Sequence, residues 1–292
     1  MHRGAGSAVG ALPCRPWRLL SFVRRRCGRR HPTSLYALAE DGLTIAMADH
    51  SPATSLLADQ RAARKFVSER FTINNRDIID AHHLAFSALA SAISSRVGVE
   101  VSATSPAIEG QMALIAQFAI GVEHCESAIA EGLYAQAAAL MKQQLETIAA
   151  VEEYRRGNRK EKVTPNIGKS LSRGLGELYG KLNEISHPSR HNIAKNIVLQ
   201  QAGGKSGANI VVQYNGDLAR ELYGQHVYLI QMVVRMVDIL FSNVYGAGIS
   251  WQEKQWCGDS QMVLVKSGLI RVDPAAQGKD ADWVRSISPQ PL

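Results

Sequence analysis

The sequence feature that most constrains the fold is Val227–Val244, a long and almost entirely apolar segment. Gln231, Arg235 and Asp238 interrupt it, and each of these side chains is costly to place in hydrocarbon. Arg235 and Asp238 are three residues apart, so they lie on one face of a helix and can pair there. The segment therefore predicts a helix buried in a bundle or at a dimer interface rather than a membrane span.

Helical periodicity extends far beyond this segment, from Leu56 to Tyr245. Pro106 is typical of a first helical turn, Gly132 separates two periodic stretches, and Pro188 ends another. We expect helices at approximately 56–71, 76–96, 106–131, 133–156, 167–186 and 217–245.

Two short runs before the last of these helices, Asn196–Gln201 and Asn209–Gln213, have the composition of β-strands. The glycine-rich residues between them indicate a turn. The sequence therefore predicts an all-α protein, a bundle of five or six helices with one inserted β-hairpin before the last long helix.

The net charge of +7 is concentrated at the N-terminus, where residues 1–46 hold eight arginines and two acidic residues. This segment is typical of a targeting presequence, of a basic binding arm, or of an extension absent from a working protein that starts at Met47. We expect it to be disordered or not part of the working protein. Residues 47–248 are predicted to form the helical domain, and residues 249–292 a weakly ordered tail with one hairpin, 262–265 with 269–272.

The four cysteines are scattered and form no CxxC pair, which indicates neither a zinc site nor a disulfide framework. We therefore expect a reducing, cytoplasmic location. Gly204-Lys205-Ser206 resembles part of a phosphate-binding loop, but no helix follows it, so a turn explains it. No cofactor-binding motif is identified.

The predicted helix 167–186 carries the most informative pattern. Leucines form an apolar stripe on one side, and Gly176, Gly180, Asn183 and His187 lie nearly opposite. Two glycines cost about 1 kcal/mol each in helix propensity but let a neighbouring backbone approach closely. We therefore expect a helix packed on both sides, with a polar groove beside Asn183 and His187. A tight crossing in which His187 only caps the helix end is the other interpretation.

Residues 178–189, read as LYGKLNEISHPS, resemble the LY..L.E..HPS segment of uncharacterised bacterial helical proteins. Those proteins are similar in outline to HEPN-type domains, small helical modules that often act as metal-independent RNases or as partners of nucleotidyltransferases. Lys142 and Glu146 stand where such proteins tend to carry an arginine and a glutamate four residues apart. The resemblance covers residues 130–245.

Active HEPN nucleases carry an arginine four to six residues before a histidine, and Lys181 replaces that arginine here. A lysine cannot hold a phosphate with two parallel donors. The resemblance nevertheless implies that His187 acts as general acid or base for attack by a ribose 2′-hydroxyl. Lys181 or Arg190 would stabilise the charge on phosphorus, beside Asn183.

A di-metal site is a further alternative, because Asp80 precedes His83 and Glu184 precedes His187 by three residues. Ferritin-like bundles use this spacing on two helices, together with one glutamate from each of two others. Three glutamates qualify: Glu123, Glu126 and Glu146.

One observation opposes that alternative. Asp80 and His83 lie off the apolar face of their helix, whereas His82 lies on it and is expected to be a hydrogen-bonded core residue. We therefore predict neither a metal nor a cofactor for the preferred function.

The preferred function is a cytoplasmic helical interaction or regulatory module. It would bind a protein partner or associate with itself through the last helix, with RNA as the alternative ligand and no DNA-binding motif. An HEPN-like RNase centred on His187 and a di-metal carboxylate bundle are the alternatives, so enzymatic activity is left open.

Overall fold

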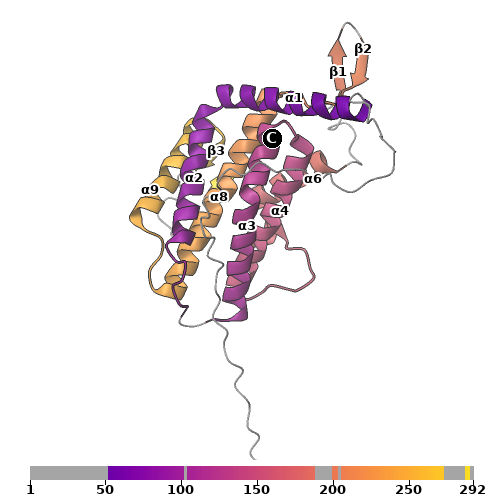
Figure 1. The fold of residues 1–292 in the computed structure, drawn as a ribbon. Helices are drawn as coiled ribbons and strands as arrows, with labels where there is room; N and C mark the ends of the chain where they lie inside the picture. The colour runs from indigo at the N-terminus through magenta and orange to yellow at the C-terminus, as the bar shows by residue number, and fades with distance from the viewer. Residues whose placement is uncertain (1–51, 102–103, 188–198, 203–204, 273–286, 290–292) are drawn as a thin grey trace, which may run out of the picture.

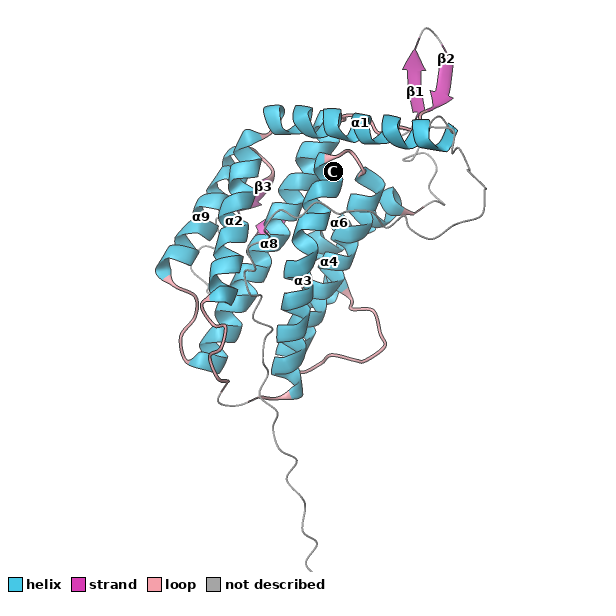
Figure 2. Cartoon of the chain, viewed as in Figure 1, coloured by secondary structure: helices cyan, strands magenta, loops and turns pink. Residues whose placement is uncertain are grey.

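The computed structural model describes residues 52–101, 104–187, 199–202, 205–272 and 287–289. In these ranges the chain forms eight helices and two short antiparallel strand pairs. Helices dominate the described chain (Figure 2), so the prediction of a mainly α-helical protein is confirmed. The predicted basic extension, residues 1–46, lies outside the described residues.

Long helices form the centre of the molecule, where α8 contacts α2, α3 and α4 (Figure 1). Helix α1 lies across one end of this bundle. The central helices are α2 (Arg76–Ser94), α3 (Pro106–Ala130), α4 (Tyr134–Arg155) and α8 (Gly216–Tyr245), and α1 spans Pro52–Asn74.

Helix α8 explains the long apolar segment. It is long and apolar enough to cross a membrane by composition alone, with a mean hydropathy of 1.5 in its most apolar window. However, 72% of that window is buried inside the protein, which is consistent with the core helix of a soluble protein. The side chain of Asn215 caps its start by accepting from the N–H of Leu218 at 3.2 Å.

Two of the helix boundaries follow the residues that predicted them. Ser105 caps α3 by accepting from the N–H of Ile108 at 3.3 Å, and Pro106 occupies the first turn. Gly132 has φ 78° between α3 and α4, a conformation that favours glycine. Local sequence therefore determines where these two helices begin and end.

The predicted helix 167–186 is wrong as a single helix, because α5 (Ile167–Ser170) and α6 (Arg173–Ser186) replace it. Ser172 has an extended backbone, with φ −154° and ψ 162°, and its side chain accepts from the N–H of Leu175 at 3.3 Å. A serine in this role starts a new helix. The predicted leucine stripe nevertheless faces the core on both sides of the break, at Leu171, Leu175, Leu178 and Leu182.

Strands β1 (Leu199–Ala202) and β2 (Lys205–Ala208) pair antiparallel between α6 and α8. Their bounds differ from those expected, because β2 occupies residues expected to form the turn. The expected strand at 209–213 is wrong: the side chain of Asn209 accepts from the N–H of Val211 at 3.1 Å, which bends the chain there.

The prediction of a weakly ordered tail after residue 249 is wrong for α9 (Trp251–Lys266), which packs against α2. Its helix also replaces the predicted strand at 262–265. Ser250 and Glu253 form a capping box that starts α9, with hydrogen bonds of 2.6 and 3.3 Å. After it, β3 (Ile270–Val272) pairs with β4 (Ile287–Pro289).

Candidate functional site

The predicted site lies where α6 packs against α4. The Lys142 ammonium donates to the Asn183 side-chain oxygen at 3.0 Å. The Tyr179 hydroxyl donates to the Glu146 carboxylate at 2.6 Å, and the Lys142 nitrogen lies 5.3 Å from the centre of the Tyr179 ring. We call these four side chains the α4–α6 polar strip. The structure thus brings together two segments that the sequence had linked by resemblance.

The polar groups of the strip satisfy one another. Burial and the neighbouring Glu146 carboxylate raise the pKa of Tyr179 to about 12, so its hydroxyl remains a donor at neutral pH. Charge-assisted hydrogen bonds such as these are stronger than neutral ones. The arrangement therefore holds α6 on α4.

His187 is exposed and is the capping residue after the last turn of α6. Its N–H donates to the Asn183 carbonyl at 3.0 Å, and its backbone is extended. Lys181 interacts with α8 instead, because its charge opposes the rise that burial causes in the pKa of Glu221. Arg190 lies outside the described residues. In the described structure His187 is therefore joined to Asn183 through the backbone.

The two glycines of α6 have different surroundings. A Cβ added at Gly176 would lie 3.2 Å from the Cα of Gly168 in α5, so this glycine permits a close approach between the two helices. A Cβ added at Gly180 would meet nothing within 4 Å. The predicted close packing is therefore present at Gly176 and absent at Gly180.

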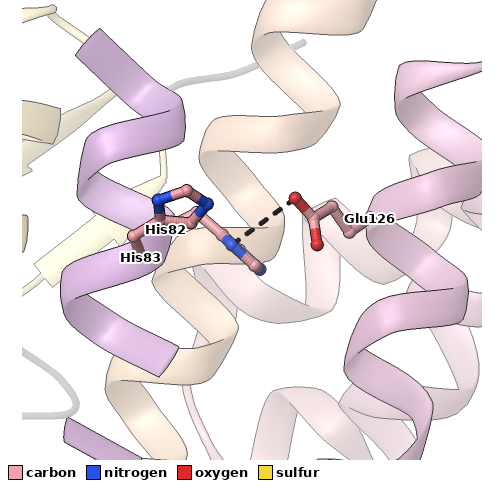
Figure 3. Close-up of side chains that lie close together, drawn as sticks. All are labelled: His82, His83 and Glu126. Carbon is pink, nitrogen blue, oxygen red and sulfur yellow. Dashed lines mark ion pairs between the residues drawn. The ribbon is translucent and has the colours of Figure 1, made fainter. Parts of the chain in front are cut away.

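A second polar cluster, which the preferred interpretation missed, lies between α2 and α3. His82 and His83 come from α2, and Glu126 faces them from α3 (Figure 3). One donor atom of each side chain lies within 4.8 Å of those of the other two. The Nδ1 atom of His82 and a carboxylate oxygen of Glu126 lie 3.7 Å apart. We call this group the α2–α3 histidine cluster.

His82 is only 2% exposed, and neither of its ring nitrogens has a hydrogen-bond partner among the described residues. The expectation for His82 is therefore correct for its burial and wrong for its hydrogen bonding. Burial lowers the pKa of His82, against the opposing charge of Glu126, and favours the neutral ring. A buried polar group without a partner costs about 1–3 kcal/mol.

Other side chains fix this cluster in the core. The Tyr223 hydroxyl of α8 donates to Glu126 at 2.9 Å. The His226 ring stacks on His82 with 5.5 Å between the ring centres, and its Nδ1 atom lies 3.0 Å from the Gln144 side-chain oxygen. His226 is completely buried, and burial lowers its pKa to about 3. The cluster is therefore held by α2, α3, α4 and α8 together.

The residues nominated for a di-metal site are divided between these places. Glu126 belongs to the histidine cluster, whereas Glu146 binds Tyr179 in the polar strip. Glu184 and His187 are on α6, which packs against α4 and α5. The position of His82 on an apolar helix face was a sequence signal for this cluster. That signal did not identify the helix that supplies Glu126.

The N-terminal helix borders a surface cavity of about 510 Å³. Arg64 lies 3.8 Å from Glu131, and Lys65 lies 4.0 Å from Glu69. Acidic side chains therefore balance much of the positive charge there. The cavity is lined by Arg61, Arg64, Lys65, Ser68, Glu69 and Glu131.

Comparison with known proteins gives no family assignment. No protein-family model matches the chain, and neither the curated proteins nor the solved structures include a match.

Proposed function

We propose that the protein is a noncatalytic helical interaction module that pairs with a second copy of itself through the outer face of α1. The observation that supports this is the exposure of α1, a helix of 23 residues in which only Val67 and Phe71 are buried. On its outer side Phe66 is 57% exposed and Ile73 is 68% exposed. Large apolar side chains gathered on one exposed face are typical of a contact surface.

The outer face has the spacing of a helix contact. Asp59, Ala62, Phe66, Arg70 and Ile73 are separated by three or four residues, and all five are exposed. An antiparallel pairing with a second α1 places Ala62 opposite Phe66 of the other copy, a small side chain against a large one. In this alignment Arg70 of the other copy lies one residue from the position opposite Asp59, so the two opposite charges are close enough to pair. This self-complementarity favours a second copy as the occupant.

Helix α8 offers less surface for the self-association expected of the last long helix. Most of its apolar side chains are buried against α2, α3 and α4. Ile239, 40% exposed, is the one large apolar side chain of α8 among the exposed residues of the described chain. The proposal therefore assigns the contact to α1.

The α4–α6 polar strip favours an interaction module rather than an enzyme. Its four side chains bind one another across α4 and α6, which accounts for them without a substrate. The proposal retains a cytoplasmic location, because Cys125 and Cys257 are free, buried thiols.

Size-exclusion chromatography of the full chain tests this proposal. Ile73→Glu places a charge in the apolar contact, so we expect this variant to elute later than the wild type. Ile120→Glu is the matched control, because Ile120 is 75% exposed on α3, and it should elute with the wild type. Identical elution of all three proteins would exclude self-association through α1.

The RNase centred on His187 is retained as a second candidate. The exposure of His187, one turn beyond Asn183, supports it, since a general acid or base must reach its substrate. Labelled RNA incubated with the full chain and with His187→Ala tests the idea. Cleavage that only the wild type performs supports the RNase, whereas equal cleavage or none excludes it.

A further inference from the structure

The α2–α3 histidine cluster, which the proposed function does not use, has the donor atoms of a metal site. Two imidazoles and one carboxylate place their donor atoms within 4.8 Å of one another. Bonds of about 2.0–2.2 Å to a tetrahedral ion would bring such atoms about 3.3–3.6 Å apart. His82 Nδ1 and a carboxylate oxygen of Glu126 are 3.7 Å apart, which is close to that separation.

The unpaired ring of His82 is an independent sign of a ligand. Buried polar atoms in proteins almost always have a partner, yet both nitrogens of this 2%-exposed ring have none among the described residues. The nitrogen that faces Glu126 is 3.7 Å from the carboxylate, which is too far for a hydrogen bond. An ion between them would contact both groups.

The surroundings orient two of the three groups in advance. Tyr223 holds the Glu126 carboxylate with a hydrogen bond of 2.9 Å. The His82 ring is stacked with the rings of Phe86 and His226, whose centres are 6.0 and 5.5 Å away. A hydrogen bond such as that from Tyr223 to Glu126 is characteristic of partners that orient metal-binding carboxylates.

The cluster is also accessible. His83 is exposed, and the Glu126 side chain is 31% exposed, while His82 forms the inner wall. An ion can therefore enter from solvent, and water can complete its coordination. Three protein ligands would leave one position of a tetrahedral ion for water.

We propose that His82, His83 and Glu126 bind one divalent ion of the zinc class. A set of two imidazoles and one carboxylate suits Zn²⁺ or Co²⁺, whereas Mg²⁺ and Ca²⁺ prefer all-oxygen ligands. The site is on α2 and α3, separate from the outer face of α1, so its failure and the failure of the proposed dimer are distinguishable.

Calorimetric titration of the tag-free full chain, first stripped with a chelator, tests the site. We expect one Zn²⁺ per chain and no comparable binding of Mg²⁺. Loss of an outer-shell partner alone weakens metal affinity about 10–100-fold, so His83→Ala and Glu126→Gln should each weaken it at least about 10-fold. His124→Ala is the matched control, since His124 is exposed on α3 near Glu126, and its affinity should equal that of the wild type.

His82 is too buried for its replacement to be informative, so the variants at the accessible ligands are used, with folding checked by circular dichroism. X-ray absorption of the zinc-loaded wild type gives a readout that needs no variant, and we expect two imidazole ligands. Absence of zinc binding, unchanged affinity in both folded variants, or a zinc spectrum without imidazole scattering would each overturn the site.

Discussion

Asp77 joins two helices of the bundle through a single charged contact. Its carboxylate accepts hydrogen bonds of 2.9 and 2.5 Å from Arg220 of α8 and one of 3.0 Å from Ser267. The Arg220 contact lowers the pKa of Asp77 from 3.8 to about 2. The contact therefore links α2, α8 and the end of α9 in a way that depends on pH.

We predict that Asp77→Asn lowers the free energy of unfolding at pH 7 and has little effect near pH 2. Because the folded pKa lies below the unfolded value, the contact stabilises above about pH 3.8 and is lost as the pH falls towards 2. The side chains of Asp77 and Arg220 are 45% and 32% exposed, so solvent screening limits the effect to about 1 kcal/mol.

Urea unfolding at the two pH values measures this difference. Asp80→Asn, at an exposed position of the same helix, is the control and should leave stability unchanged at both. An equal loss for Asp77→Asn at pH 7 and pH 2 would contradict the assignment.

Among the elements, α6 provides a matched pair of glycines. Gly→Ala in a helix gains about 0.5–1 kcal/mol when space allows. Gly180→Ala should therefore stabilise the protein, because a Cβ there meets nothing within 4 Å. Gly176→Ala should destabilise it relative to Gly180→Ala, because its Cβ meets the Gly168 backbone at 3.2 Å. Thermal or urea unfolding measures the stability of both variants. Equal effects would show that α5 leaves room for a side chain at residue 176 of α6.

The elements that the sequence predicted are those with local signals. Ser105-Pro106 and Gly132 mark helix ends through capping and backbone conformation, which need no tertiary information. Helix α9 was missed although its capping box was present in the sequence. Its buried positions include Glu253 and Ser260, so the face that packs against α2 is not an apolar stripe.

At the candidate sites, the sequence predicted less than it did for the helices. Spacing placed Lys142 one turn before Glu146, but only the packing of α4 on α6 shows that they bind Asn183 and Tyr179. His82 was assigned to the core correctly, yet its missing hydrogen bonds depend on what α3 places beside it. These side-chain partners depend on contacts between segments that are far apart in the sequence, and helical periodicity does not predict such contacts.

In the whole molecule, the bundle and α1 differ in how they are held. Helix α8 is enclosed by its neighbours, and α9 is tied to the core by Ser260, which accepts from Gln231 at 2.8 Å and donates to the Ala81 carbonyl at 2.6 Å. Helix α1 is held at one end of the bundle by two buried side chains. A second copy would cover the outer face of α1 without changing the bundle.

Light scattering on the full chain tests this pairing most directly, using Asp59→Arg, Arg70→Asp and their mixture. Asp59→Arg places like charges near each other across the antiparallel contact, and Arg70→Asp does the same with the opposite sign. The account predicts the mass of two chains for the wild type, the mass of one chain for each variant alone, and a return to two chains in the mixture. A wild type with the mass of one chain at every concentration, or variants that keep the mass of two chains, would contradict it.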